Sequence, residues 1–198
     1  FKEKFSKIKI IALDLDGTLL NNNFDLEVGT EINQMCKILY NKYKVNTLIA
    51  TGRTLLGSMT VKNTLISKIN VPLILYNGSV IVHNNTYNKK KQKFIDFGSV
   101  NKILNILKEY KKVKIYSYYY VDNLLNTYEV VKGFTSSKTD LPEKDFNGQI
   151  IQWVDSTFED DILENNYTPS AMLIDVRKSF VDEQIKIKEL MATFHDIT

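Results

Sequence analysis

Two acidic residues, Asp14 and Asp16, close the first apolar run of the sequence. The run, residues 8–15, is short and rich in Ile and Leu, which is typical of a strand covered on both faces of a parallel sheet. Side chains at positions i and i+2 of a strand share a face, so the two carboxylates can converge just beyond the strand. Gly17 then permits a sharp turn, and Thr18 adds a hydroxyl beside the acids.

The spacing of these acids points to phosphoryl transfer. Two carboxylates held this close need a proton or a cation between them, because like charges oppose their joint ionisation. A hard divalent cation such as Mg²⁺ suits oxygen ligands, and it screens a phosphate while one carboxylate attacks and the other handles the proton of the leaving group. The alternative is a purely structural turn, in which Asp14 and Asp16 cap backbone N–H groups.

The stretch Asp14-Leu15-Asp16-Gly17-Thr18-Leu19-Leu20 resembles the first motif of the haloacid dehalogenase-like hydrolases. In that superfamily, phosphatases and phosphomutases carry Asp at the position of Asp16, whereas dehalogenases lack it and P-type ATPases carry Thr. The resemblance implies that Asp14 is the nucleophile and Asp16 the general acid and base. It also implies that the Asp14 carboxylate and the Asp16 backbone carbonyl hold Mg²⁺.

Two further motifs follow later predicted strands. Thr51-Gly52-Arg53 is similar to the second motif of the Cof-type branch of these phosphatases. The Thr51 hydroxyl and nearby N–H groups can bind phosphoryl oxygens, and Gly52 permits close approach of the backbone. Arg53 can hold a phosphate or sugar hydroxyls through its planar fork, with a surface salt bridge as the alternative. Asn77 matches an Asn-Gly pair that faces the site in this branch, with a plain turn as the alternative.

Helices and strands alternate in the first part of the chain, which predicts an α/β fold with a Rossmann-like, doubly wound parallel sheet. After the first strand, we expect a helix over residues 26–43, a strand over 45–51, a helix ending near residue 67, a strand over 71–76 and an extended segment over 79–82.

The second part, beyond a polar stretch at residues 83–93, predicts an α+β layer with helices on one face of a mostly antiparallel sheet. We interpret Lys89-Lys90-Lys91-Gln92-Lys93 as a solvated connector. We interpret the tyrosines of residues 116–120 as half-buried sheet aromatics, with a place beside a substrate pocket as the alternative for some of them. The expected order begins with a helix over 100–110, a strand over 113–121, an irregular region over 132–148 and a strand over 149–154. A short helix opened by Ser156 or Thr157 follows, with Glu159, Asp160 and Asp161 as capping acids in its first turn. A strand over 171–176 and a helix from about Phe180 complete the order.

The resemblance assigns residues 1–84 to the N-terminal part of the core domain and residues 85–198 to an inserted α+β cap of the Cof type. The family's Lys motif and its Gly-Asp acidic motif should follow the cap, and the sequence contains no Gly-Asp pair. We therefore expect the C-terminal part of the core to be missing from this chain. A natural pseudoenzyme is the alternative.

Composition limits the other classes of function. The chain has 198 residues, 43% hydrophobic and 25% charged, which is ordinary for a globular protein. Its net charge of +3 is too small to indicate nucleic-acid binding, and no apolar stretch approaches a bilayer span. The single Cys36 excludes an intramolecular disulfide and fits a buried helix thiol in a reducing, cytoplasmic compartment. His83 and His195 are isolated and lack a zinc-site spacing, so we expect both to face solvent. We expect a monomer or a weak homo-oligomer.

The sequence thus predicts Mg²⁺-dependent hydrolysis of a small phosphorylated metabolite, such as a sugar phosphate, through an aspartyl-phosphate intermediate. Two other functions stay open: a phosphomutase of the same superfamily, and a non-catalytic binding or regulatory protein. Thr51-Gly52-Arg53 fits the phosphatase branch better than the mutase branch.

Overall fold

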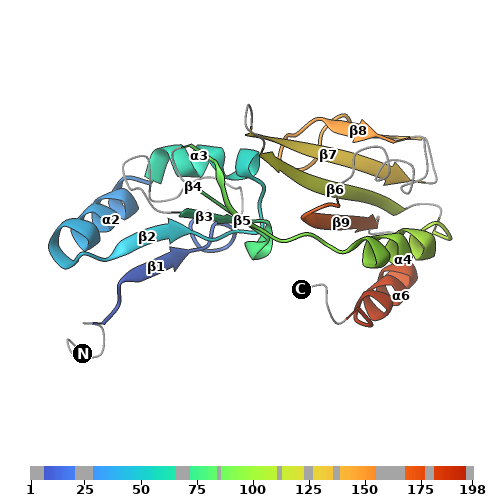
Figure 1. Cartoon of the computed structure of the whole chain (residues 1–198), viewed down its shortest axis with the longest axis horizontal. Helices are drawn as coiled ribbons and strands as arrows, with labels where there is room; N and C mark the ends of the chain where they lie inside the picture. Colours follow the sequence, from blue (N-terminus) through green and yellow to red (C-terminus); the bar gives the residue numbers. More distant parts are fainter. Residues whose placement is uncertain are drawn as a thin grey trace. The chain divides into compact units, whose positions relative to one another are not determined.

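The computed structural model describes residues 7–20, 29–65, 72–83, 86–110, 113–122, 127–135, 139–154, 168–176 and 181–194 (Figure 1). The chain divides into two compact units. The first comprises Phe1–Gln92 with Asp122–Thr127, and the second comprises Lys93–Val121 with Tyr128–Thr198. The first unit therefore ends at Gln92, beyond the predicted boundary after residue 84.

Three short strands of the first unit run in the same direction. Strand β1 (Ile10–Leu13) pairs in parallel with β2 (Asn46–Ile49). A parallel bridge between Ala50 and Ile74 extends this direction to β3 (Pro72–Leu75). Parallel neighbours need long crossover connections, and these contain α2 (Gly29–Tyr43) and α3 (Leu55–Leu65), which contact each other. The carboxyl ends of all three strands therefore meet at one edge.

The core of this unit lies around β2 and β3, where Ile49, Leu73 and Leu75 are fully buried. Strand β1 differs, because Ile10 is 59% exposed and the strand's four residues are all exposed or half-buried. The prediction of a first strand covered on both faces is wrong for the described residues, because no residue of β1 is buried.

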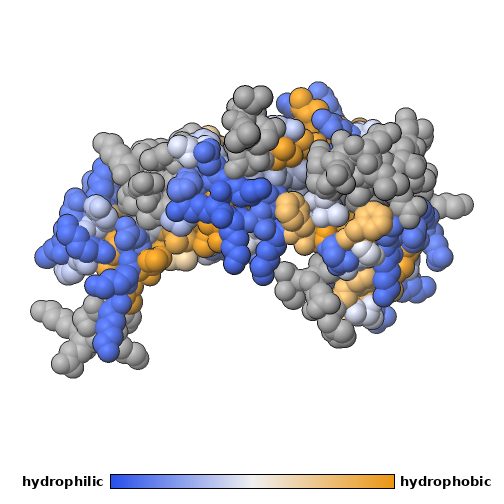
Figure 2. All heavy atoms as spheres, viewed as in Figure 1, coloured by the Kyte–Doolittle hydropathy of each residue, from blue (hydrophilic) through white to orange (hydrophobic). Residues whose placement is uncertain are grey.

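Strands β4 (Val80–His83) and β5 (Lys89–Gln92) extend β3 in antiparallel fashion. The interpretation of this lysine-rich segment as a connector is wrong. Its backbone pairs with β4, while Lys89, Lys90 and Lys91 remain exposed. Lysines are common on edge strands because their charge discourages further pairing. Figure 2 shows hydrophilic atoms over β5.

The second unit has a four-stranded sheet in the order β8-β7-β6-β9. Strands β6 (Val113–Asp122) and β9 (Ala171–Val176) are antiparallel, whereas β7 (Thr127–Thr135) and β8 (Ile151–Trp153) are parallel. Helices α4 (Phe97–Leu107) and α6 (Val181–Met191) share one core with the sheet. The buried residues of this core are Val100, Ile103, Leu104, Leu107, Val113, Ile115, Phe134 and Ile187.

Strand β7 overturns part of the predicted irregular region over 132–148, because Lys132–Thr135 belongs to this strand. Lys and Gly are depleted in strands, so the sequence around Lys132 and Gly133 did not indicate strand β7. A hypothetical Cβ on Gly133 would lie 2.6 Å from Trp153 Cε3, and this close approach is what a glycine permits.

The tyrosines of residues 116–120 are all buried, with exposed fractions between 2% and 6%, so the prediction of half-buried aromatics is wrong. Tyr116 packs edge-on against Trp153, with ring centroids 6.0 Å apart, and Tyr118 packs edge-on against Phe146 at 6.5 Å. The Trp153 Nε1–H donates to Pro142 O at 2.9 Å. The chain around Pro142 and Phe146 thus contributes to the burial of β6.

Two single-residue predictions are confirmed. Cys36 is a buried free thiol within α2, and His83 is exposed. The short helix predicted near Ser156 with its three acids, and His195, lie outside the described residues. No helix within the described ranges is long and apolar enough to cross a membrane.

Candidate active site

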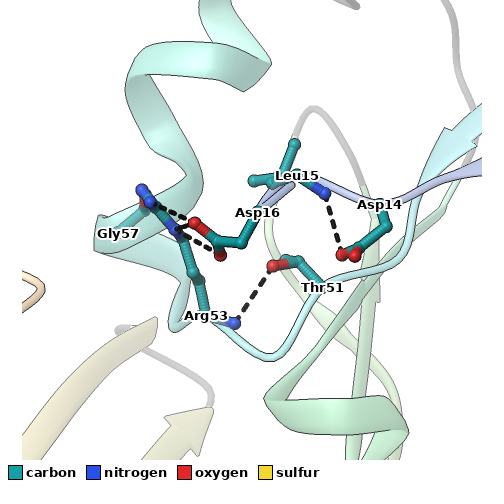
Figure 3. A network of polar contacts seen from close by, with 6 residues as sticks. All are labelled: Asp14, Leu15, Asp16, Thr51, Arg53 and Gly57. Carbon is teal, nitrogen blue, oxygen red and sulfur yellow. Dashed lines mark hydrogen bonds and ion pairs between the residues drawn. The ribbon is translucent and has the colours of Figure 1, made fainter. Parts of the chain in front are cut away.

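Residues from three strand ends form the candidate active site. Asp14 follows β1 directly, Thr51 lies two residues beyond β2, and Asn77 lies two residues beyond β3. Because these strands are parallel, their carboxyl ends bring the three positions together, as in the ligand-binding crevices of open α/β sheets. Figure 3 shows Asp14, Asp16, Thr51 and Arg53 gathered at this edge.

The turn after β1 exposes both acids and buries the residue between them. Leu15 is fully buried, and its carbonyl accepts hydrogen bonds from the N–H groups of Thr18, Leu19 and Leu20 at 3.3, 2.9 and 2.8 Å. Asp14, Asp16 and Thr18 are exposed. Gly17 has a φ of 73°, which a residue with a Cβ adopts rarely.

The Asp14 carboxylate has a fixed orientation at the strand end. Its Oδ1 atom accepts a hydrogen bond from the Leu15 N–H at 2.8 Å. This local bond is the kind that the capping alternative predicts. It holds the carboxylate against the start of the turn.

Thr51 is buried and joins the second strand end to the third. Its N–H donates to Ile74 O at 2.9 Å, and its carbonyl accepts from the Asn77 N–H at 3.2 Å. The Thr51 hydroxyl oxygen accepts from the Arg53 N–H at 3.1 Å, and the Arg53 carbonyl accepts from the Tyr76 N–H at 3.1 Å. Thr51-Gly52-Arg53 therefore forms a turn that is bonded along its length to the end of β3.

Asn77 lies against the same turn. It has a φ of 52° in the left-handed region, which Asn tolerates better than most residues. A hypothetical Cβ on Gly52 would lie 2.7 Å from Asn77 Oδ1. The geometry of Asn77 thus fits the predicted turn, and its amide also occupies the space that a glycine leaves at the second motif.

Arg53 forms an ion pair with Asp16. Its Nε–H donates to Asp16 Oδ2 at 2.9 Å and, more weakly, to Oδ1 at 3.2 Å, while Nη2–H donates to Oδ1 at 2.6 Å. Its Nη1–H donates to Gly57 O at 3.0 Å, in the first turn of α3. The structure therefore has Arg53 in the salt-bridge arrangement that the sequence offered as the alternative to phosphate binding.

Thr54 supports the site by capping a helix, a role that the sequence analysis did not assign to it. Its hydroxyl accepts a hydrogen bond from the Gly57 N–H at 3.0 Å, which caps the first turn of α3 next to Arg53. The signal that could have identified this cap is a threonine immediately before an expected helix. The cap fixes the backbone to which the Arg53 guanidinium is bonded.

The metal-binding capacity of these residues is limited. Among the residues that the structure describes, no three His, Cys, Asp or Glu side chains cluster closely enough to bind a metal ion. Mg²⁺ is commonly bound by one or two carboxylates together with water and substrate phosphate. The exposed Asp14 carboxylate fits this mode of binding, and Asp16 can contribute its backbone carbonyl, because Arg53 engages both oxygens of its carboxylate.

The family of the chain follows from comparison with known proteins. The family model described as haloacid dehalogenase-like hydrolase matches residues 11–197. The chain belongs to this family. No curated protein matches the sequence.

Solved structures share the fold. A haloacid dehalogenase-like hydrolase from Bacteroides thetaiotaomicron has a TM-score of 0.62 at 17% identity, covering 93% of this chain and 63% of its own. A protein from Thermotoga maritima has a TM-score of 0.62 at 20% identity, covering 96% and 63%. A sugar phosphatase of subclass IIB has a TM-score of 0.57 at 17% identity, covering 91% and 62%. The chain thus spans under two thirds of the length of these three structures, and the likeness confirms the α/β fold.

Proposed function

We propose that the full-length protein hydrolyses a small phosphomonoester, such as a sugar phosphate, in a Mg²⁺-dependent reaction. The observation that carries this proposal is the exposure of Asp14 and Asp16 together at the end of β1, beside the Thr51 turn. Family membership adds support, because the matched family is one of hydrolases. The similar fold of a sugar phosphatase favours a phosphorylated sugar.

Asp14 is the proposed nucleophile. One of its carboxylate oxygens forms a bond to phosphorus while the bond from phosphorus to the substrate alcohol breaks, which leaves an aspartyl-phosphate. The hydrogen bond from the Leu15 N–H to Asp14 Oδ1 restricts rotation of the carboxylate before the attack. Water then cleaves the aspartyl-phosphate and releases inorganic phosphate, which restores Asp14.

Asp16 is the proposed general acid and base. It gives a proton to the departing alcohol oxygen in the first step and takes a proton from the attacking water in the second. Thr51, the backbone of Gly52, and Asn77 are proposed to bind the phosphoryl oxygens, with Thr18 beside them. The Thr51 hydroxyl oxygen already accepts from the Arg53 N–H, which leaves the hydroxyl hydrogen to donate to phosphate.

The Asp14 carboxylate and the Asp16 backbone carbonyl would hold Mg²⁺, which when bound neutralises charge on the phosphoryl group. We propose that the first unit is the core and that the second unit is a cap that selects the substrate. The free thiol of Cys36 supports a cytoplasmic location for the enzyme.

The test is a hydrolysis assay of the full-length protein with p-nitrophenyl phosphate and a panel of sugar phosphates. We expect release of inorganic phosphate with Mg²⁺, loss of release in excess chelator, and no turnover by Asp14→Asn. Asp182→Asn, which changes an exposed acid of α6, is the matched control and should behave like wild type. Undiminished activity in chelator would overturn the proposal, as would isomerised sugar phosphate without free phosphate.

A further inference from the structure

We infer that Arg53 is a positioning residue for Asp16, and that it is not a ligand of the phosphoryl group. This inference rests on the proposed function, because it assigns the role of one side chain in the same reaction. It departs from the sequence-based expectation that Arg53 holds phosphate or sugar hydroxyls. Three observations support it: the direction of the guanidinium fork, the anchoring of Arg53, and the exposure of its partner.

The guanidinium fork points at Asp16. Nε and Nη2, the two donors on one edge of the plane, bind the two oxygens of the carboxylate at 2.9 and 2.6 Å (Figure 3). This two-point geometry is the one that arginine also uses for phosphate. While the edge is engaged with Asp16, it cannot make the same contact with a phosphoryl group.

Arg53 is itself held at three points. Its Nη1–H donates to Gly57 O in the capped first turn of α3. Its backbone N–H donates to the Thr51 hydroxyl oxygen, and its carbonyl accepts from the Tyr76 N–H. The guanidinium is therefore tied to a helix and to two strand ends, so a side chain bound to it takes a defined position.

Asp16 needs such support. Its side chain is 45% exposed, whereas that of Arg53 is 19% exposed. An exposed carboxylate in a turn samples several rotamers, and only some would reach the oxygen of a leaving group. A displacement of about 1 Å in a reacting group can cost roughly 10²-fold in rate. Holding Asp16 by two hydrogen bonds restricts it to one orientation relative to Asp14.

The two possible roles of Arg53, positioning Asp16 and binding phosphate, predict different losses of rate for substrates with different leaving groups. Every phosphate ester carries the same phosphoryl group, so loss of a phosphate ligand slows all esters alike. Loss of a correctly placed general acid slows esters of alkyl alcohols, which leave as poorly stabilised alkoxides, much more than p-nitrophenyl phosphate. The ratio of kcat/KM for the two classes therefore distinguishes the roles.

The experiment compares wild type, Arg53→Lys, Arg53→Gln, Asp16→Asn and Asp16→Asn/Arg53→Lys in the full-length protein. Arg53→Lys keeps the charge and removes the fork. We expect its kcat/KM for a sugar phosphate to fall by about 10²-fold, while the value for p-nitrophenyl phosphate and the inhibition constant of inorganic phosphate change little. Arg53→Lys should add almost nothing to Asp16→Asn, because the residue acts through Asp16.

Lys37→Gln, which removes an exposed positive charge on α2, controls for a general effect of charge. Equal losses for both esters with a weakened binding of inorganic phosphate would overturn the inference and make Arg53 a phosphate ligand. Unchanged kinetics in both Arg53 variants would overturn it as well. Inactive wild type would instead refute the proposed function, so the two failures are distinguishable.

Discussion

Asp16 is proposed to transfer a proton in each half-reaction, and its carboxylate forms an ion pair with Arg53. Asp16→Asn keeps the size of the side chain and one hydrogen-bond acceptor for the guanidinium, but it removes the acid. We predict that sugar phosphate hydrolysis falls by about 10²- to 10⁴-fold, because proton transfer is the main loss. Steady-state kinetics measure the effect.

Thermal unfolding of Asp16→Asn provides the control for stability. A pair as exposed as Asp16 and Arg53 contributes about 0–1 kcal/mol, so the melting temperature should change little. Loss of folding in Asp16→Asn would contradict the small contribution of the ion pair to stability. Near-normal hydrolysis by this variant would contradict the assignment of Asp16 as the general acid and base.

The sequence predicted the acids and the Thr51 motif correctly as strand-end residues, because a short apolar run followed by polar residues indicates where a buried strand ends. It could not predict the partner of Arg53. Asp16 and Arg53 are separated by 37 residues, and only the parallel pairing of β1 with β2 brings them together. Local patterns contain no information about such a distant pair. The chemical roles of these residues remain predictions.

At the scale of the element, the turn after β2 depends on Gly52. In Gly52→Ala the new Cβ would lie 2.7 Å from Asn77 Oδ1. That atom is at the end of a rotatable side chain, so we expect the Asn77 amide to move away while the fold persists. A hydrogen bond to a charged group contributes about 1.5–3 kcal/mol, so the inhibition constant of inorganic phosphate should rise about tenfold or more.

Asn77→Gly tests whether displacement of the Asn77 amide causes the weaker binding of phosphate in Gly52→Ala. It removes the same amide and is compatible with the positive φ of this position. The double variant Gly52→Ala/Asn77→Gly should bind phosphate no more weakly than the worse single variant. Additive losses would mean that Gly52 acts independently of Asn77.

Gly133 in β7 has a packing role. A Cβ at this position would lie 2.6 Å from Trp153 Cε3 and 2.7 Å from Ile151 Cγ2, and both neighbours are on the paired strand β8. Overpacking of this kind costs about 1–3 kcal/mol. We predict that Gly133→Ala lowers the free energy of unfolding by that amount, as measured by urea denaturation.

The Trp153→Ala background provides the matched comparison for Gly133→Ala. With the indole removed, the added methyl group should cost less, although the Ile151 contact remains. An equal cost in both backgrounds would show that the clash with Trp153 is not the cause.

Elements with strong apolar patterns were predictable, and elements with polar or glycine-containing sequences were not. Strand β9 has the expected bounds, and helix α4 is present but begins and ends three residues before the expected range of 100–110. Strands β5 and β7 were missed because their stability comes from pairing with β4 and with β6 and β8, respectively. Lys89–Gln92 carries three lysines, and β7 contains Lys132 and Gly133, so neither has the local propensity of a strand.

At the scale of the whole molecule, the buried tyrosines of β6 link stability to pH. Burial raises the pKa of Tyr118 far above its ordinary value of 10.0, and the nearby Asp145 carboxylate raises it further. Burial also raises the pKa of Tyr116, with smaller contributions from the charges of Asp175 and Asp145. Above about pH 10, the unfolded chain therefore loses phenolic protons that the folded chain keeps.

Stability from these tyrosines is fully present below pH 10 and decreases as the pH rises further, by about 1.4 kcal/mol per pH unit for each tyrosine that ionises only on unfolding. We predict that Tyr118→Phe removes one such contribution, so that its free energy of unfolding falls less steeply between about pH 10 and 11.5. Urea denaturation across this range measures the slope, and Tyr43→Phe, at a 57% exposed tyrosine of α2, is the control. Because Phe keeps the ring that packs against Phe146, an unchanged slope in Tyr118→Phe would mean that this hydroxyl ionises equally in both states.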